Sequence, residues 1–260
     1  MLLCIDIGNT NIVLGLHGDG KWLAQWRIRT APDVMPDEYA MLLKQLLADR
    51  GCSFTEITMV TVASVVPPLT GVFSELCQRY LGKQALIIGP GVRTGMRIRI
   101  DNPAELGADL VCDAVAAYQR FGTACIVVDF GTATTFSAIA KNGDFLGVAI
   151  ALGLGVAADA LAARTAQLPR VHLIPPPTAI GKNTVHSMQS GLIFGYVGLV
   201  ESLIARIQGE LGGHAKVIAT GGLAPVIASL THVFDEVDPW LTLEGIRIIS
   251  ERNASEGGLR

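Results

Sequence analysis

Continuous apolar runs dominate the hydrophobic pattern of this chain. Residues 2–7 and 124–130 are apolar apart from one aspartate each, and each run is followed by a short polar turn and a second apolar run. Uninterrupted runs of this kind are typical of strands covered on both faces, whereas half-exposed strands alternate between apolar and polar positions. The pattern therefore predicts buried strands in an α/β fold.

Helical periodicity appears between these strands. Residues 36–50 carry two acids in the first turn, an apolar stripe of four leucines, and a glycine directly after the last turn, all features of an amphipathic helix. A second helix is expected over residues 101–122, with Asn102 as N-cap, Pro103 as the first helical residue and Glu105 as the third. Further strands are expected at residues 22–29, 57–64 and 85–88, and a short helix after Pro68.

The strand–turn–strand pattern occurs twice, about half a chain length apart. Residues 6–10 read D-I-G-N-T and residues 129–132 read D-F-G-T; both copies end an apolar run and lead into another strand. A D-x-G tripeptide is common by chance, so the shared context carries the inference of an internal duplication. We therefore expect two similar halves, residues 1–118 and 119–250, followed by a flexible tail at residues 251–260.

Composition narrows the class of protein. The 260 residues are 50% apolar and only 17% charged, and the mean hydropathy is +0.44. Yet the longest uncharged stretches (57–74, 183–200 and 217–234) are interrupted by proline, glycine or polar residues, and no signal peptide is visible. We therefore expect no membrane partner. The net charge of −3 and the lack of a basic block likewise argue against nucleic acid.

The cysteines and histidines indicate neither a disulfide framework nor a metal centre. The five cysteines are an odd number, include no C-x-x-C pair and mostly fall in apolar segments, which fits a reduced, cytoplasmic compartment. The five histidines are scattered, without the spacing of metal ligands. The polar turns and their carboxylates are therefore the candidate functional groups of this chain.

The two polar turns have the features of phosphate-binding sites. Gly8 and Gly131 would let a phosphate approach the main chain, and neighbouring threonines would supply hydroxyl donors. Asp6 or Asp129 would repel phosphate unless a cation lay between them, and Mg²⁺ is usually bound by one or two carboxylates together with substrate phosphates. The alternative is that each aspartate only satisfies a hairpin turn. Recurrence in both halves favours the phosphate site.

Two groups of glycines lie outside these turns. Gly221-Gly222 separates an expected strand from an expected helix, where it would admit a flat or phosphorylated ligand or form a simple tight turn. Gly191, Gly195 and Gly198 recur along one face of an expected helix. That pattern is typical of close helix packing, including packing across a dimer.

Carboxylates recur at every fourth position in residues 105–113. Glu105, Asp109 and Asp113 would line one helical face, which usually indicates a solvated acidic surface. However, the small residues Gly107 and Ala108 leave room beside Asp109. A carboxylate in such a gap is a candidate general base for a substrate hydroxyl.

These motifs together resemble those of type III pantothenate kinases, within the superfamily of acetate and sugar kinases, heat-shock chaperone ATPases and actin. The resemblance runs in order from about residue 2 to residue 250. It rests on residues 6–10 (D-I-G-N-T), 107–109 (G-A-D), 129–135 (D-F-G-T-A-T-T), 181–184 (G-K-N-T) and 219–222 (A-T-G-G). It implies duplicated ribonuclease H-like (actin-like ATPase) domains, each a mixed five-stranded sheet with flanking helices. It also implies ATP-dependent phosphorylation of pantothenate, the first step of coenzyme A biosynthesis, by a cytoplasmic homodimer that requires Mg²⁺ and a monovalent cation, K⁺ or NH₄⁺.

The same resemblance implies roles for individual residues. Asp109 would be the proton acceptor for the pantothenate hydroxyl, Asp129 would bind the monovalent cation, and Asp6 would reach Mg²⁺ through the phosphates. The implied ATP-binding residues are Asp6, Ile7, Gly8, Asn9, Thr10, Asn11, Ile12, Val13, Thr132, Gly221 and Gly222. The implied pantothenate-binding residues are Ile100, Gly107, Ala108, Asp109, Leu110 and Thr184.

Several positions depart from the family pattern. Leu110 replaces the arginine of G-A-D-R, and Ile100 replaces the tyrosine that commonly precedes D-N-P. Val148 and Leu152 replace a glycine and a proline of the G-G-A-I-x-P-G run, and Asp113 stands where asparagine is common. Because pantothenate carries a carboxylate, loss of a guanidinium partner would weaken its binding by about 10- to 150-fold.

Two functions from different classes therefore remain open. The chain is either a working pantothenate kinase or a nucleotide-binding family member with lost or altered specificity that serves a regulatory or accessory role. A third hypothesis, with less support from the residues, is a kinase for another hydroxyl substrate. Retention of Asp6, Asp109, Asp129 and Thr184 favours catalysis, because a degenerate enzyme is under no requirement to keep its base.

Overall fold

The computed structural model describes residues 1–254, which form two compact units. The first unit comprises residues 1–96, residues 101–116 and the C-terminal helix, and the second comprises residues 97–100 and 117–240. These units differ from the expected halves, 1–118 and 119–250, mainly because the C-terminal helix groups with the first unit.

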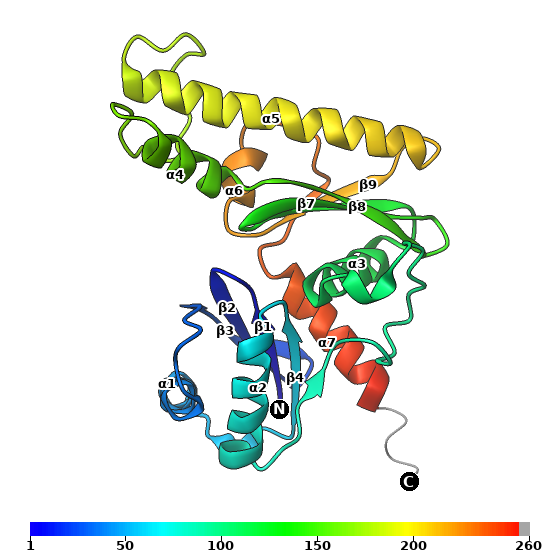
Figure 1. Cartoon of the computed structure of the whole chain (residues 1–260). Coiled ribbons are helices and arrows are strands. Elements are labelled where there is room, and N and C mark those ends of the chain that lie inside the picture. The colour runs from blue at the N-terminus through cyan, green and yellow to red at the C-terminus, as the bar shows by residue number, and fades with distance from the viewer. Residues whose placement is uncertain (255–260) are drawn as a thin grey trace. The chain divides into compact units, whose positions relative to one another are not determined.

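The first unit is built on a mixed five-stranded sheet in the order β3-β2-β1-β4-β5 (Figure 1). Strands β1, β2 and β3 are antiparallel neighbours, β4 runs parallel to β1, and β5 runs parallel to β4. The bounds are β1 (Leu2–Ile7), β2 (Asn11–Gly18), β3 (Lys21–Arg29), β4 (Met59–Ser64) and β5 (Leu86–Ile87). The β1–β2 hairpin pairs Ile7 with Ile12 and leaves the expected polar turn between them.

Both faces of this sheet are covered. Leu3 and Ile5 of β1 are fully buried in a core shared with α1 and α2. On the face against α7, the buried Thr61 of β4 donates a hydrogen bond from its hydroxyl to that of Ser250, at 2.8 Å. The helices are α1 (Pro36–Ala48), α2 (Pro67–Leu76) and α7 (Leu241–Ala254), with short turns at η1 (Phe54–Glu56), η2 (Cys77–Leu81) and η3 (Pro103–Glu105). Cover on both faces explains why the strands read as uninterrupted apolar runs.

The second unit repeats this topology. Its sheet has the order β10-β9-β6-β7-β8, with β6, β7 and β8 antiparallel and β9 and β10 added in parallel. The bounds are β6 (Cys125–Phe130), β7 (Ala133–Ile139), β8 (Phe145–Leu152), β9 (Lys216–Thr220) and β10 (Glu236–Val237). Because the order and the strand senses match those of the first sheet, the expectation of two similar α/β sheets is confirmed.

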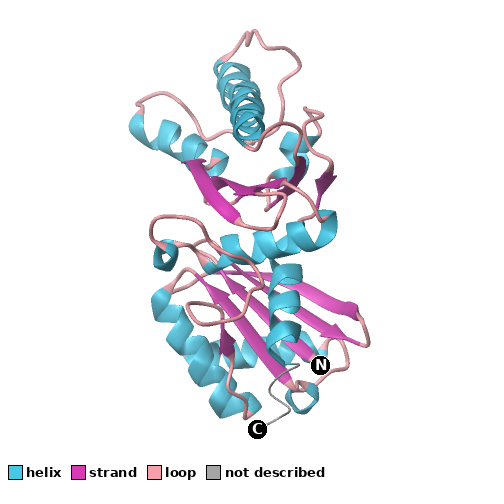
Figure 2. Ribbon diagram, turned by 90° about the vertical axis from the view of Figure 1, so that its right-hand side faces the viewer, coloured by secondary structure: helices cyan, strands magenta, loops and turns pink. Residues whose placement is uncertain are grey.

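One long helix dominates the second unit. In the core of this unit, Ile193, Tyr196 and Val200 of α5 pack with Phe130 and Phe136 of the sheet. The helices are α4 (Leu154–Arg164), α5 (Thr184–Glu210) and α6 (Ala224–Ala228), and α3 (Ala108–Phe121) contributes residues to both units. Figure 2 shows the strands in magenta with helices on the faces of each sheet.

Two local expectations were wrong. The helix expected to begin at residue 101 instead begins at Ala108, after a separate 3-10 turn at η3. Asn102 does not cap a helix: its side-chain amide donates to the Glu105 carboxylate at 2.7 Å, and the chain leaves η3 in an extended conformation at Leu106. At the other end, residues 251–254 belong to α7 rather than to the expected tail, whose remainder, residues 255–260, lies outside the described residues.

The expectation that residues 183–200 fail the test for a membrane span was also wrong. Within residues 1–254, α5 is the one helix long and apolar enough to cross a membrane, judged by length and composition. Interspersed serines, glutamine and histidine do not break the helix, and only 22% of its most apolar stretch is buried. Core helices pass the same test, so the finding is weak support for a membrane. It does identify α5 as an apolar helix that the second unit leaves largely unburied.

Candidate active site

The first polar turn joins β1 to β2. The Gly8 N–H donates to the Asn11 carbonyl at 3.0 Å, and the Thr30 hydroxyl donates to the Gly8 carbonyl at 2.6 Å. Thr30 also donates its N–H to the Thr10 carbonyl at 3.0 Å. These bonds hold the backbone of the turn while the side chains of Asn9 and Thr10 remain exposed. Thr30 was missed from the sequence, because only strand pairing brings the end of β3 to this turn.

The side chains of residues 6–13 do not all point to solvent. Ile7 and Ile12 face each other across the hairpin and are fully buried, so only their main-chain atoms are available to a ligand. Asn9, Thr10 and Asn11 are exposed at the tip, and Asp6 is half-buried at the end of β1. The turn thus offers backbone and short polar groups beside one carboxylate, as phosphate binding through a cation requires.

Three carboxylates of the first unit lie near one buried thiol. The pKa of the fully buried Cys112 is raised well above its ordinary value, first by burial and then by the nearby Asp113, Asp6 and Asp109. The fold therefore brings the aspartate of the first turn into the neighbourhood of the two on α3. Glu105 is not part of α3, because it lies in η3.

Asp109 occupies the first turn of α3. Its Oδ1 accepts the Leu110 N–H at 2.8 Å. Burial raises the pKa of the Asp109 carboxyl, and hydrogen bonds from the backbone of Leu110 and of Asp109 itself oppose that rise. A Cβ at position 107 would lie 2.4 Å from Asp109 Oδ1, so only glycine leaves the carboxylate in this position. Gly107 thus shapes the space around Asp109.

The second polar turn joins β6 to β7. The Gly131 N–H donates to the Ala133 carbonyl at 3.1 Å, the counterpart of the Gly8 bond in the first turn. Gly131 and Thr132 are exposed at the tip, whereas Thr134 is buried and accepts a hydrogen bond from the Tyr196 hydroxyl. The two threonines beside Gly131, which were expected as hydroxyl donors to phosphate, therefore differ: Thr132 lies at the surface and Thr134 does not.

Asp129 lies beside the glycine pair. Gly221 has a φ of +89°, and a Cβ there would lie 2.4 Å from Asp129 Oδ1 and 2.7 Å from the backbone of Phe130. Gly221 is therefore required for the close approach of β9's end to the carboxylate, whereas Gly222 is exposed. The structure brings Asp129 and Gly221 together, which sequence spacing could not indicate.

The remaining candidate residues belong to different segments of the two units. Leu110, in α3 of the first unit, is buried with 8% exposure. Ile100, in the second unit, is half-buried. Thr184 is exposed as the first residue of α5, directly after Asn183, whose side chain caps the helix by accepting the His186 N–H at 2.8 Å. Within residues 1–254, no three His, Cys, Asp or Glu side chains converge as a metal centre. A bound cation would therefore rely on one or two carboxylates and on neutral oxygens.

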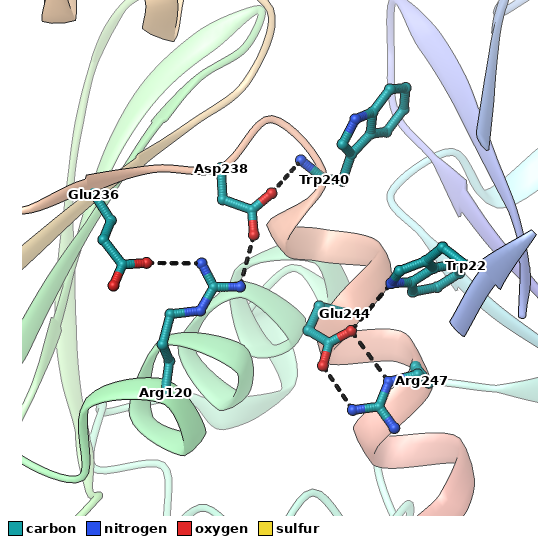
Figure 3. Close-up of polar contacts among 7 residues, drawn as sticks. All are labelled: Trp22, Arg120, Glu236, Asp238, Trp240, Glu244 and Arg247. Carbon is teal, nitrogen blue, oxygen red and sulfur yellow. Dashed lines mark hydrogen bonds and ion pairs between the residues drawn. The ribbon is translucent and has the colours of Figure 1, made fainter. Parts of the chain in front are cut away.

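Hydrogen bonds and ion pairs also hold α7 and α3 within their units. In the first unit, Glu244 of α7 accepts hydrogen bonds from Trp22 at 3.3 Å and from Arg247 Nε at 3.1 Å (Figure 3). In the second, Arg120 of α3 binds Glu236 at 3.0 Å and Asp238 at 2.6 Å (Figure 3). These contacts link α7 to β3 and the last turn of α3 to the segment at β10, so their role is structural.

The chain is similar to known proteins along most of its length. The sequence model of type III pantothenate kinases matches residues 2–206. A type III pantothenate kinase of Moorella thermoacetica is 53% identical over 253 residues, which cover 97% of this chain and 100% of that protein. The chain belongs to the type III pantothenate kinase family. A second relative with this name, from Myxococcus xanthus, is 49% identical over 97% of this chain and 99% of that protein.

Solved structures support the fold of this family member. The ethanolamine utilization protein EutJ from Carboxydothermus hydrogenoformans has a TM-score of 0.56 at 14% identity and covers 95% of this chain and 89% of that chain. Component A of the Acidaminococcus fermentans (R)-2-hydroxyglutaryl-CoA dehydratase has a TM-score of 0.55 at 14% identity, over 98% and 99% of the two chains. At such identities the likeness concerns the fold alone. The expected actin-like ATPase fold is confirmed.

Proposed function

We propose that this chain transfers the γ-phosphoryl group of ATP to the hydroxyl of pantothenate, the first step of coenzyme A biosynthesis. Family membership over nearly the whole chain supports this activity. The observation that carries it is the placement of Asp109, a half-buried carboxylate with a raised pKa in the first turn of α3, beside a glycine that makes room for it. Such a group is suited to accept a proton.

Asp109 acts as the general base in this proposal. It accepts the proton of the pantothenate hydroxyl while that oxygen forms a bond to the γ-phosphorus of ATP; the bond to the β–γ bridging oxygen breaks, and ADP leaves. Phosphoryl transfer asks the protein mainly to position the reactants and to neutralise charge. One general base and two phosphate-binding turns are therefore sufficient for this reaction.

Each turn is assigned to ATP in this proposal. Residues 6–13 offer main-chain groups and the exposed Asn9, Thr10 and Asn11, and Thr132 offers an exposed hydroxyl in the second turn. Asp6 would hold Mg²⁺ that is also bound to the ATP phosphates. Mg²⁺ usually binds only one or two carboxylates, together with substrate phosphates and water molecules. Gly222, exposed beside Gly221, remains the candidate contact for the adenosine group.

A monovalent cation, K⁺ or NH₄⁺, completes the cofactors that we propose. Its ligand is Asp129, whose carboxylate is approached closely by the backbone at Gly221 and Gly131. Such a site combines one negative charge with neutral oxygens, the type of donor that alkali cations accept. Turnover of ATP with pantothenate should therefore rise when potassium replaces a larger organic cation.

Pantothenate binding is assigned to Ile100, Gly107, Ala108, Asp109, Leu110 and Thr184. Leu110 supports a second candidate function, because an apolar, buried side chain stands where the family pattern has arginine. A family member that binds nucleotide in an accessory role, or that phosphorylates another hydroxyl compound, would share the ATP residues and differ here.

One assay separates these functions. ADP release and the mass of the phosphorylated product are measured with pantothenate, for the wild type and for Asp109→Asn. Product formation that depends on Asp109 supports the kinase. No turnover at millimolar pantothenate, with ATP binding intact, would support the accessory role. Unchanged turnover in the variant would remove Asp109 as the base.

We also propose that the chain is a homodimer formed through α5. Gly191, Gly195 and Gly198 are exposed on this helix, and a Cβ at each would meet no other atom within 4 Å. A stripe of small residues on a largely exposed apolar helix suits close packing against a second copy. Val185, in the first turn of the same helix, is an exposed apolar side chain as well.

The dimer is tested by light scattering of the eluted protein and by flotation with vesicles. Gly195→Leu should give a monomer, whereas Gly71→Leu, an exposed glycine with equally open surroundings on α2, should leave the dimer intact. A monomeric wild type that floats with the vesicles would show instead that lipid covers α5.

Cytoplasmic location is part of the same proposal. All five cysteines are free, and four of them are buried. Burial raises the pKa of Cys77 and of Cys125 to about 12, so these thiols remain protonated and unreactive. Reduced, inert cysteines suit a reducing compartment. Fractionation of cells that express the tagged chain tests this assignment.

A further inference from the structure

Asp129 lies in a row with two threonines across the second sheet. The antiparallel register of β6 and β7 pairs Asp129 with Thr135, and the parallel register of β6 and β9 pairs it with Thr220. Register partners on adjacent strands project from the same face of a sheet, and partners directly opposite in an antiparallel pair have Cβ atoms about 4.5–5.5 Å apart. The carboxylate is therefore flanked on both sides by hydroxyl-bearing residues.

The hydroxyl of Thr135 is unusual. Its Oγ1 is buried and has no hydrogen-bond partner in the part of the chain that the structure describes. The adjacent Thr134 points to the opposite face, where it accepts from Tyr196. Buried hydroxyls are nearly always paired, because an unpaired one loses its hydration without replacement. An unpaired Oγ1 on the residue opposite Asp129 is available to bind a ligand.

The surroundings of Asp129 identify the type of ligand. A Cβ at Gly221 would lie 2.4 Å from Oδ1, and one at Gly131 would lie 3.4 Å from Oδ2, so backbone approaches both oxygens. The neighbourhood thus supplies one carboxylate, a buried hydroxyl and peptide groups, without a histidine or cysteine cluster among residues 1–254. Oxygen donors with a single negative charge suit a hard cation of low charge.

We propose that Thr135 Oγ1 is a ligand of the monovalent cation at Asp129. This inference rests on the proposed cation requirement and adds to it a second side chain. In this assignment Oγ1 would supply a lone pair to the cation. Without the cation, Thr135 carries the cost of a buried, unpaired hydroxyl, so cation binding and local stability are linked.

Thermal unfolding tests the assignment. Midpoints are measured with Mg²⁺ and a non-hydrolysable ATP analogue, in potassium chloride and in tetramethylammonium chloride of equal ionic strength. The wild type should unfold at a higher temperature in potassium. Thr135→Val, which keeps the shape but removes the hydroxyl, should lose that increment and should be no less stable than the wild type without potassium. A merely structural hydroxyl would instead lower both midpoints.

Two variants serve as matched controls. Thr135→Ser keeps the oxygen and should retain the potassium increment. Ser137→Ala removes a buried hydroxyl two residues further along the same face of β7, opposite Val127 rather than Asp129, and should also retain it. In steady-state assays, the potassium concentration for half-maximal turnover should rise by about tenfold or more in Thr135→Val. Thr135→Ala repeats the comparison should the valine variant not fold.

The possible outcomes separate the two proposals. A full potassium increment in Thr135→Val, with the increment lost in Asp129→Asn, would overturn the role of Thr135 and leave the cation at Asp129 in place. A wild type without any potassium increment and without potassium-dependent turnover would overturn both. Loss of the increment in both variants, with rescue by serine, supports Thr135 as a ligand.

Discussion

Gly245 of α7 lies directly against the main-chain carbonyl of Cys112 on α3. A Cβ at position 245 would lie 2.0 Å from the Cys112 oxygen and 2.4 Å from its carbonyl carbon. The two helices therefore meet backbone to backbone, and neither can shift toward the other. Because Cys112 lies between Asp109 and Asp113 on α3, this contact also sets the depth at which the proposed base is held.

Replacement of Gly245 should disturb both the fold and the chemistry. Alanine would force α7 away from α3, and overpacking of this kind costs about 1–3 kcal/mol. We expect Gly245→Ala to lower the free energy of unfolding in urea and to reduce kcat. Gly71→Ala is the control, because position 71 is exposed in α2 with no atom within 4 Å; it should gain up to about 1 kcal/mol of helix propensity. Equal stability of Gly245→Ala and the wild type would contradict the tight contact.

Removal of the proposed base should abolish most of the turnover. Asp109→Asn keeps the size of the side chain but cannot accept the proton, and a general base contributes about 10²–10⁴-fold to rate. We expect a fall in kcat of that size with little change in the affinity for ATP. Steady-state kinetics together with calorimetric ATP titration separate the two effects. A fall in ATP affinity equal to the fall in rate would assign Asp109 a binding role instead.

The raised pKa of Asp109 has a defined effect on stability. Since the pKa is higher in the folded state, this carboxyl stabilises the fold below its ordinary value of 3.8, and that contribution is lost as the pH rises through the raised folded pKa. Asp109→Asn should therefore be more stable than the wild type near neutral pH, and the difference should shrink in acid. Urea unfolding at several pH values measures it.

Asp144 provides a control of opposite sign. A hydrogen bond from Arg99, at 3.0 Å, lowers the pKa of this carboxyl. Its contribution to stability is present above the ordinary carboxyl pKa and is lost as the pH falls through the lowered value. Asp144→Asn should therefore be less stable than the wild type near neutral pH and should match it in strong acid. The same direction for both variants would contradict the assignment of the Asp109 shift to burial.

Restoration of arginine at position 110 tests the substrate pocket. A guanidinium that reaches the pantothenate carboxylate would form a charge-assisted hydrogen bond worth about 1.5–3 kcal/mol. We expect Leu110→Arg to lower the KM for pantothenate by about 10- to 150-fold. Leu110→Met, which keeps an apolar side chain in this buried position, should leave the KM unchanged. An unaltered KM in the arginine variant would place position 110 away from the carboxylate.

Local pattern sufficed for much of the fold. The paired strands, both hairpin turns and α1 were predicted within a few residues, because apolar runs, turn residues and helix-end signals act over short distances in the chain. The start of α3 was mispredicted because local helix-start signals do not show how far the helix continues. Asn102, Pro103 and Glu105 favour a helical turn, and they form one, but the chain becomes extended again before Ala108.

For the candidate site, too, the residues themselves could be predicted from the sequence but their surroundings could not. Asp6, Asp109 and Asp129 were singled out from the sequence, since each is a carboxylate set among small or apolar residues. The residues around them come from segments far apart in the chain, so they could not be predicted. Thr30 binds the first turn, Gly221 lies against Asp129, and Gly245 lies against Cys112.

The sequence by itself thus determined the strands, the duplicated turns, the family and the carboxylates that carry the proposed chemistry. Each of these depends on residue type and spacing within a short window. Only the tertiary structure decided that Thr135 lies opposite Asp129 with its hydroxyl unpaired, and that α7 contacts the backbone of α3 at Gly245. Strand register and backbone contact are set by packing between distant segments, so they become visible only when the chain is folded.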